Sequence, residues 1–201
     1  MKHTWLHTGT MAVLAVAVAG TPLAAQRTNL GAQQANASPT AQIARSGARP
    51  PDVASPQAVV TALYDVITGP AAQPRDWDRF RSLFLDGARL TWVQAGPAGQ
   101  QYFFNLTVED FIRLAGPGYT MGDGFWEREI GHHIDQFGTI AHVFSTYEMR
   151  LAGPKAEVVE RGINGVQFLY HQNRWWITNL VFDVETPANP IPARYLGNTG
   201  G

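Results

Sequence analysis

Four long segments rich in aromatic and β-branched residues occupy the carboxy-terminal half of the chain and constrain its fold most. Such composition is typical of β-strands, and only short stretches containing glycine, proline or asparagine separate the segments. Consecutive strands joined by short turns pair antiparallel. The pattern therefore predicts a strongly bent antiparallel meander. Its four strands are expected at residues 125–137, 139–151, 161–171 and 175–185.

Helical signals precede this meander. Ser55 followed by proline supplies an N-cap and a first-turn proline, and apolar residues then recur at helical spacing. A second helix is expected from Asp76 to Gly87, and a third from the capping-box-like start at Thr107. A single strand, residues 88–94, is expected between the second and third helices. Helices first and a meander later predict an α+β fold.

The amino-terminal part has a different character. Residues 1–25 have the pattern of a secretory signal peptide. A membrane-spanning helix is not expected there, because the apolar run 11–20 is too short to span a bilayer. Residues 26–54 are rich in small and polar residues and are expected to form a disordered linker. One domain is expected at 55–196, followed by a short disordered tail at 197–201. We therefore expect an exported protein, periplasmic or secreted, without a stable membrane anchor after cleavage.

Charge and cysteine content exclude several classes of function. The formal net charge is -1 and no run of Lys or Arg occurs, which argues against a nucleic-acid partner. The chain has no cysteine, so neither a disulfide framework nor a thiol nucleophile is available. The glycines show no phosphate-loop or dinucleotide-binding spacing, and no cofactor is expected.

Three stretches carry a resemblance to a known family: IDQFGTIAHVFSTYEMR, RGINGVQFLYHQNRWWITNLVFDVE and TPANPIPARYL. With the order helix, helix, strand, helix, long strands, the chain resembles the nuclear transport factor 2 (NTF2)-like, or SnoaL-like, superfamily. The resemblance implies a cone in which three N-terminal helices pack in a strongly curved antiparallel sheet around a pocket. It also implies a homodimer formed through the sheet. Such folds host isomerases, cyclases, dehydratases, ligand binders and interaction modules, so the resemblance assigns no reaction.

A histidine-rich stretch begins at Gly131. Adjacent strand residues point to opposite faces, so His132 and His133 share a site only if a bulge intervenes at the glycine. His133 and Asp135 do share a face, and they could form an acid–base pair or a structural hydrogen bond. Two such residues are too few for a metal site, and none is expected.

Candidate pocket residues lie on three of the predicted strands. The resemblance places Ser145 and Tyr147 on the concave face. Alternation on the last strand puts Asn179 and Asp183 on one face, and an enclosed Asp183 would suit a general acid or base. Gln167, on the strand before, is a candidate for orienting a ligand carbonyl or hydroxyl.

Three functions stay open. The first is an exported pocket protein that binds a small apolar ligand through Tyr147, Ser145, Asn179, Gln167 and Asp183. The second is a cofactor-independent isomerase, cyclase or dehydratase, with proton transfer by Asp183 or the His133–Asp135 pair together with Tyr147. The third is a dimerising interaction module with a filled core.

Overall fold

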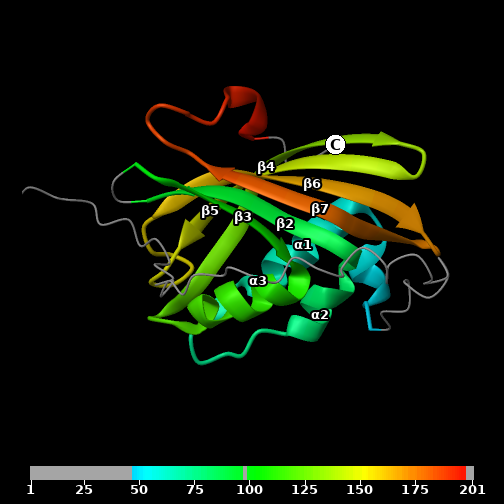
Figure 1. Cartoon of the computed structure of the whole chain (residues 1–201), viewed down its shortest axis with the longest axis horizontal. Helices are drawn as coiled ribbons and strands as arrows, with labels where there is room; N and C mark the ends of the chain where they lie inside the picture. Colours follow the sequence, from blue (N-terminus) through cyan, green and yellow to red (C-terminus); the bar gives the residue numbers. More distant parts are fainter. Residues whose placement is uncertain (1–46, 97–98, 198–201) are drawn as a thin grey trace, which may run out of the picture. The chain divides into compact units, whose positions relative to one another are not determined.

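The structure is a computed structural model that describes residues 47–96 and 99–197. The expected signal peptide, most of the expected linker and the last four residues lie outside these ranges. Within them, no helix is both long and apolar enough to cross a membrane. The fold is α+β, with helices and one large curved sheet (Figure 1).

Some residues before the expected boundary at Ser55 pack against the domain. Pro50–Val53 forms a 3-10 turn, and the Val53 side chain is buried. Asp52 forms an ion pair with Arg79, at 2.7 Å from its Nε atom. The end of the expected linker is thus part of the domain, because it buries one apolar side chain and pairs its charge.

The first two helices start where their caps predict. α1 is Pro56–Ile67, and the Ser55 hydroxyl accepts a hydrogen bond from the Ala58 backbone. α2 is Trp77–Ser82, capped by Asp76 in the same way. The second helix is shorter than predicted, because Phe84 already begins a strand.

The third helix does not belong to an amino-terminal block. α3 is Val108–Ala115, capped by Thr107, and it follows two strands. β2 is Phe84–Ala95, longer than the single strand that was predicted. β3, Gln101–Thr107, was missed, although Tyr102, Phe104 and Leu106 alternate as in a strand.

The sheet has seven strands in the order β1-β4-β5-β6-β7-β2-β3. Besides β2 and β3, the other five strands are β1 Gly69–Pro70, β4 Gly124–Phe137, β5 Ile140–Arg150, β6 Glu160–His171 and β7 Arg174–Val184. The meander β4–β7 is antiparallel as predicted. The whole sheet is mixed, because β2 pairs with β7 in parallel. The prediction of a purely antiparallel sheet was wrong for this pair, which joins strands far apart in the sequence.

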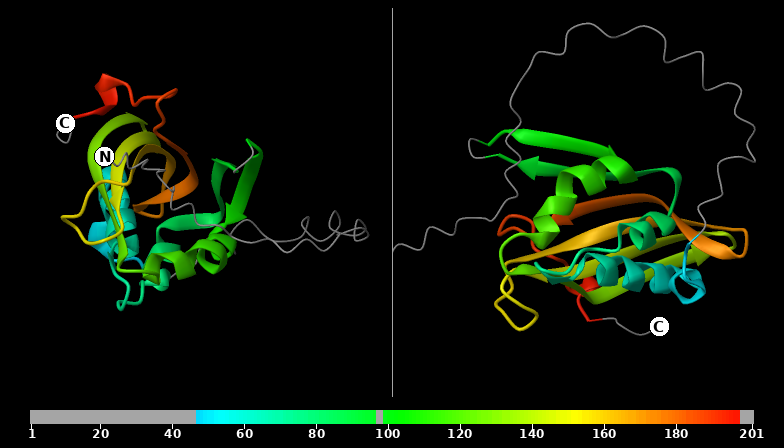
Figure 2. Two further views of the ribbon diagram at one scale, coloured as in Figure 1. Left: turned by 90° about the vertical axis from the view of Figure 1, so that its left-hand side faces the viewer. Right: turned by 90° about the horizontal axis from the view of Figure 1, so that it is seen from below.

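One face of the sheet, here called the inner face, curves around α1 (Figure 2). The three helices lie on that side (Figure 1). Antiparallel neighbours directly opposite each other share a face. The fully buried core therefore gathers inner-face side chains of several strands with those of α1 and α2, and it includes Val59, Phe80, Phe84, Leu90, Val143, Val166 and Ile177.

Two bulges change which side chains reach the inner face. In β4 the register shifts between Glu129 and Gly131, so His132 lies opposite the buried Ser145. In β7 the register shifts at Thr178, so Leu180 turns inward and is buried. The bulge considered at Gly131 is thus present, and the one in β7 was not foreseen.

The outer face is partly covered by the carboxy-terminal arm. The Thr146 hydroxyl donates to the Tyr195 carbonyl at 2.7 Å, and the Tyr195 ring stacks on Phe144 at 5.3 Å. Gly131 allows this close approach, because a Cβ atom there would lie 2.6 Å from the Tyr195 carbonyl oxygen. The arm is therefore part of the domain.

Candidate functional site

Polar side chains collect at one end of the inner face. Cross-strand register places Glu127 opposite Met149, and Met149 opposite Glu160. The next inward pairs along the strands are Glu129 with Tyr147 and Ser145 with Asn164. We call this set the polar end, and its members are Glu127, Glu129, Ser145, Tyr147, Glu160 and Asn164.

Tyr64 of α1 reaches into the polar end. Its hydroxyl lies 2.8 Å from Ser145 Oγ, and Asn164 Nδ2 donates to it at 3.0 Å. Burial, reinforced by the nearby Glu127 carboxyl, raises the pKa of the Tyr64 hydroxyl above its ordinary value. The phenol therefore stays protonated at any physiological pH.

Two carboxyl groups lie on the strands on either side of Met149 at this end, Glu127 on β4 and Glu160 on β6. Burial and the neighbouring Glu160 raise the pKa of Glu127 to about 8, and hydrogen bonding from Asn164 partly offsets the rise. Burial also raises the pKa of Glu160, although the Tyr147 hydroxyl donates to its Oε1 at 3.0 Å. Near neutral pH, Glu127 is therefore largely a neutral acid, able to give or take a proton.

Glu129 forms a separate set of hydrogen bonds on the same strand. Ser145 Oγ donates to its Oε1 at 2.6 Å, and Gln57 Nε2 donates to its Oε2 at 2.6 Å. His132 Nδ1 lies 3.2 Å from the same Oε2. This carboxyl group joins α1, β4 and β5, and it contacts the Tyr64 hydroxyl only through Ser145.

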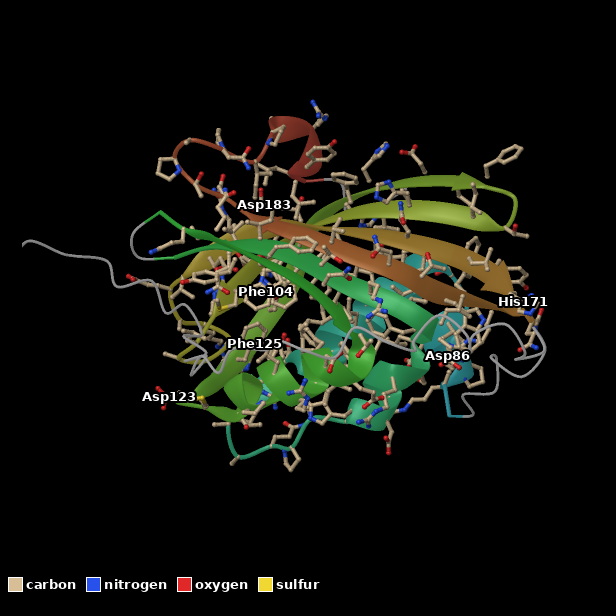
Figure 3. All side chains as sticks on the ribbon, viewed as in Figure 1. Asp86, Phe104, Asp123, Phe125, His171 and Asp183 are labelled. Atoms are coloured by element: carbon tan, nitrogen blue, oxygen red, sulfur yellow. The ribbon has the colours of Figure 1, made fainter. Side chains whose placement is uncertain are left out.

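Aromatic rings adjoin the carboxyl groups. Tyr119 packs edge-on against Phe125 at 4.6 Å, and it lies close enough to Glu127 and Glu160 for their charges to raise its pKa further above the level set by burial. The rings continue through Phe111 to Trp92, which stacks on Phe104 at 4.5 Å and on Phe182 at 5.2 Å. In Figure 3, Phe104 and Phe125 lie at the end of the sheet opposite His171 and Asp86. These rings form an apolar wall beside the polar end.

Arg75 fixes the position of Tyr119. Its Nη2 donates to the carbonyls of Gly69 and Tyr119 at 2.6 and 2.7 Å, and its Nε donates to the Ile67 carbonyl at 2.7 Å. The side chain is buried, and burial lowers the pKa of its guanidinium. This arginine ties the end of α1 to the segment that carries Tyr119.

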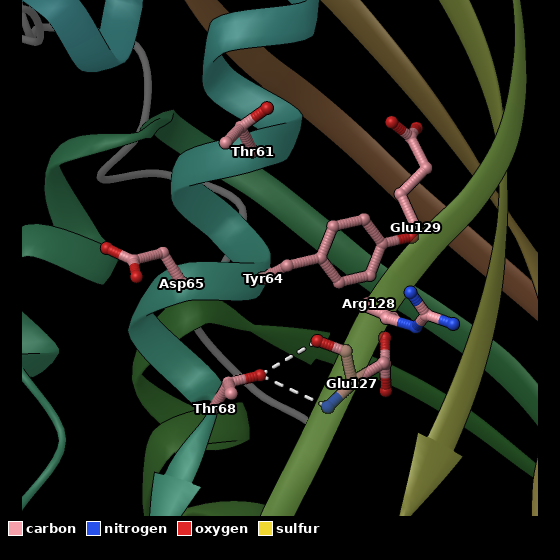
Figure 4. Close-up of a pocket in the computed structure, with 7 residues that line it drawn as sticks. All are labelled: Thr61, Tyr64, Asp65, Thr68, Glu127, Arg128 and Glu129. Atoms are coloured by element: carbon pink, nitrogen blue, oxygen red, sulfur yellow. Dashed lines mark hydrogen bonds between the residues drawn. The ribbon is translucent and has the colours of Figure 1, made fainter. Parts of the chain in front are cut away.

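A small open cavity lies between α1 and β4. Its volume is about 200 Å³, and Tyr64, Glu127 and Glu129 form part of its lining. In Figure 4 the Tyr64 ring extends from α1 toward β4. The Thr68 hydroxyl donates to the Glu127 carbonyl at 2.8 Å and accepts from the Glu127 amide at 3.1 Å, which closes one side (Figure 4). The cavity is smaller than the roughly 300 Å³ at the lower end of ordinary ligand sites, so it admits only a small group.

The structure divides the candidates that the sequence singled out. Ser145 and Tyr147 are buried on the inner face at the polar end. Gln167 is exposed on the outer face, opposite the half-buried Asn179. Asp183 is exposed as well, and it accepts hydrogen bonds from Val184 and Asn189. The predicted alternation in β7 fails at the bulge, so Asn179 and Asp183 do not share the inner face with Ile177.

The expected His133–Asp135 pair is present but faces outward. His133 Nε2 lies 3.2 Å from Asp135 Oδ2, with side chains 57% and 76% exposed. It is therefore separated by the sheet from Tyr147. Among the residues that the structure describes, no cluster of three or more His, Asp or Glu is arranged to hold a metal ion.

Sequence reasoning missed most of the acidic and phenolic groups of the site. Glu127 and Glu129 lie on the same strand face as Phe125, at a spacing of two residues. This spacing was the sequence signal that could have identified them as site residues. Glu160 was not among the predicted site residues, because a glutamate beside Arg161 resembles a surface ion-pair partner; Arg161 instead pairs with Glu185 at 2.6 Å. Tyr64 gave no signal, since one tyrosine on an apolar helix face is usually a core residue.

Comparisons with known proteins return similarity in structure but not in sequence. No family model and no curated protein match the chain. A Nostoc punctiforme protein of unknown function with a cystatin-like fold is 9% identical, with a TM-score of 0.49, covering 65% of this chain and 89% of that one. An NTF2-like protein of unknown function from Silicibacter pomeroyi is 16% identical, with a TM-score of 0.43, covering 64% and 92%.

A third solved structure is described as a putative ketosteroid isomerase from Parabacteroides distasonis. It is 12% identical, with a TM-score of 0.44, and the match covers 66% of this chain and 89% of that one. The Silicibacter protein is itself described as NTF2-like, the fold that the sequence resembles. All three TM-scores are below 0.5, so the site is interpreted from this chain's own geometry.

Proposed function

We propose that the polar end of the inner face binds a small, largely apolar molecule that carries one polar oxygen or nitrogen. The observation that supports this most is that two carboxyl groups with raised pKa, Glu127 and Glu160, lie near the Tyr64 and Tyr147 hydroxyls, the second of which donates to Glu160. Buried polar groups are costly unless they are satisfied, and a fold retains such a set most readily where it serves recognition.

The surroundings indicate the size and character of the ligand. The wall beside the carboxyl groups consists of rings, including Phe125 and Trp92, that are half-buried rather than sealed in the core. Aromatic rings with a few convergent polar groups are the usual lining of a small-molecule site. A planar or alicyclic molecule could stack on this wall and direct its polar atom toward Glu127.

Proton transfer on such a ligand is a second candidate function. A carboxyl group with a pKa of about 8 changes protonation near neutral pH, which suits a general acid or base. Glu160, a second carboxyl group nearby, could hold the proton between steps. This reaction would need no cofactor. In it, Glu127 and Glu160 take the proton-transfer role that was expected for Asp183 or for the exposed His133–Asp135 pair.

Native mass spectrometry of the gently purified full chain tests ligand binding. We expect an additional mass that disappears on denaturation and is lost in Glu127→Gln. The control Glu157→Gln changes an exposed glutamate and should retain the mass. An apo spectrum for the wild type, with no binding in a fragment screen, would contradict a ligand-binding function.

Proton transfer has its own readout. If Glu127 moves a proton, a ligand recovered from the wild type in D₂O should gain deuterium at carbon, and one incubated with Glu127→Gln should not. Equal deuterium uptake in both proteins would exclude Glu127 as the base while leaving binding intact.

We also propose that the protein works after export and as a homodimer. Export is supported by the amino-terminal pattern, and self-association by the apolar outer face, where Ile140 and Val181 are 56% and 42% exposed. Amino-terminal sequencing of the mature protein tests the first point, and light scattering with an Ile140→Lys variant tests the second. A dimer with no ligand would favour the interaction-module alternative.

A further inference from the structure

The hydroxyl protons at the polar end are already committed to protein acceptors, which limits what a ligand can be. Ser145 has one proton, and its Oγ lies 2.6 Å from Glu129 Oε1. The Ser145 hydroxyl is the donor in this pair, and the carboxylate oxygen accepts. The Ser145 oxygen is left as an acceptor for any other neighbour.

The surroundings of Glu129 hold this arrangement. Gln57 Nε2 donates to the other carboxyl oxygen at 2.6 Å, and His132 Nδ1 lies 3.2 Å from that oxygen. Ser145 and Gln57 thus donate to the two different oxygens of one carboxylate, which accepts from both. The Ser145 proton is therefore fixed toward Glu129, and the residue itself is fully buried.

The direction of the Tyr64 hydroxyl follows from that of Ser145. The two oxygens are 2.8 Å apart, and because Ser145 can only accept here, Tyr64 must donate. Asn164 Nδ2 donates to the Tyr64 oxygen at 3.0 Å, which also requires that oxygen to accept. Tyr64 thus has no proton left to donate to a ligand. Toward a ligand, its oxygen can only accept a hydrogen bond.

Tyr147 is committed in the same sense, because its hydroxyl donates to Glu160 Oε1 at 3.0 Å. Both inner-face tyrosines therefore direct their protons into the protein. A bare carbonyl or ether oxygen placed beside Tyr64 would face another acceptor, and an unpaired buried acceptor is costly.

We propose that Glu129, acting through Ser145, sets the specificity of the site by holding Tyr64 as a hydrogen-bond acceptor, so that the ligand presents a donor, such as a phenol, an alcohol or an amide N–H. This inference rests on the proposed small-molecule site. Glu129 and Ser145 are positioning residues, since they act through Tyr64 and not on the ligand directly.

The direction of the Tyr64 proton can be measured without a ligand. The intensity ratio of the tyrosine Fermi doublet in Raman spectra distinguishes a phenol that donates from one that accepts. The difference between wild type and Tyr64→Phe isolates Tyr64, and we expect the intermediate ratio of a phenol that both donates and accepts, because Tyr64 donates to Ser145 and accepts from Asn164. Ser145→Ala should change this ratio to that of a phenol that only accepts, whereas Ser145→Thr, which keeps a hydroxyl, should retain it.

Ser82→Ala is the matched control, because Ser82 is another buried serine whose hydroxyl donates to the Arg79 carbonyl. It should leave the Tyr64 signature unchanged. A wild-type ratio typical of a phenol that only accepts, or an intermediate ratio that survives in Ser145→Ala, would overturn the inference even if ligand binding is established.

Two simple probes test the ligand class. Phenol can donate a hydrogen bond and anisole cannot, while both present a similar ring to the aromatic wall. By ligand-observed NMR we expect phenol to bind at least about tenfold more tightly than anisole, and Ser145→Ala to narrow the difference. Anisole binding as well as phenol to the wild type would refute the inference but keep the site. Binding of neither would count against the proposed function, and the Raman result would then decide the inference alone.

Discussion

The inner face of the sheet has two ends that share the same strands but differ in chemistry. At the apolar end, Val143 and Val166 face each other across β5 and β6, and both are fully buried. A few residues along the same strands, Tyr147 lies opposite Gly162 and Met149 opposite Glu160. The polar end therefore lies on the same two strands as the core, without a separate domain or inserted loop.

The two ends differ in what stabilises them: apolar burial at one end and hydrogen bonds at the other. The apolar end is covered by α1 and α2, whose buried side chains include Val59 and Phe80. At the polar end, α1 contributes the Tyr64 hydroxyl, and the half-buried Thr68 follows directly after the helix. We infer that burial at the apolar end supplies most of the folding free energy. The polar end contributes less to stability, because its buried groups serve recognition.

Truncation of a large side chain should separate the two ends most clearly. Ile177→Ala at the apolar end removes a fully buried side chain, and we expect a loss of about 2–5 kcal/mol in the free energy of unfolding. Met149→Ala at the polar end truncates a half-buried side chain and should cost less than about 2 kcal/mol. Urea denaturation measures both. Equal losses would mean that the two ends contribute alike to stability.

The pH dependence of stability should come from the polar end. The pKa of Glu127 rises from 4.5 to about 8 on folding, so between these values the folded state holds a proton that the unfolded state has lost. Stability should therefore fall as pH rises through this window, by at most about 1.4 kcal/mol per pH unit from this group.

Glu127→Gln should reduce that slope, because the amide does not titrate. The raised pKa of Glu160 acts in the same direction and leaves a smaller residual slope. Denaturant midpoints measured from pH 5 to pH 9 give the comparison, with Glu157→Gln as the control. A slope unchanged in Glu127→Gln would show that this carboxyl ionises freely in the folded protein.

A double-mutant cycle should reveal the hydrogen bonds that hold the polar end together. Tyr64→Phe leaves the Asn164 amide without its phenol acceptor, and we expect a cost of about 1–3 kcal/mol. In Tyr64→Phe with Asn164→Leu the combined cost should be smaller than the sum of the single costs, since both polar partners are gone. Tyr170→Phe is the control: its exposed hydroxyl donates to Asn173, and its removal should cost below about 0.5 kcal/mol. Strict additivity would contradict a coupled network.

The smallest expected effect is that of the exposed histidine pair. His133→Ala removes a contact with Asp135 in which the two side chains are 57% and 76% exposed, and we expect a change within about 0.5 kcal/mol. His132→Ala, on the neighbouring residue, removes a side chain that is 12% exposed and bonded to Glu129, so it should cost more. If the two variants lost equal stability, the assignment of opposite faces beyond the bulge would fail.

Much of this architecture could be predicted from local sequence. The meander strands β4–β7 begin and end within a residue or two of their predicted limits, because turn residues such as Gly138 and Asn173 act over a few positions. The N-caps Ser55, Asp76 and Thr107 were identified for the same reason. The family resemblance, and not local periodicity, had placed Tyr147 and Ser145 on the concave face, and both side chains are buried.

What could not be predicted depends on contacts between distant segments. Regular alternation placed Asn179 and Asp183 inward, but one extra residue at Thr178 turns them outward. Likewise, the pairing of β2 with β7 in parallel joins segments that no local signal connects.

The sequence by itself thus determined the class of fold, the strands and their caps, since these follow from short-range propensity and periodicity. Only the tertiary structure decided which side chains share the inner face at each end of the sheet. Glu127, Glu160 and Tyr64 come from three separate segments, and none of these residues is unusual within its own segment. Their chemistry arises because register and bulges are set by packing of the whole sheet against α1, and because burial there changes what a carboxyl and a phenol can do.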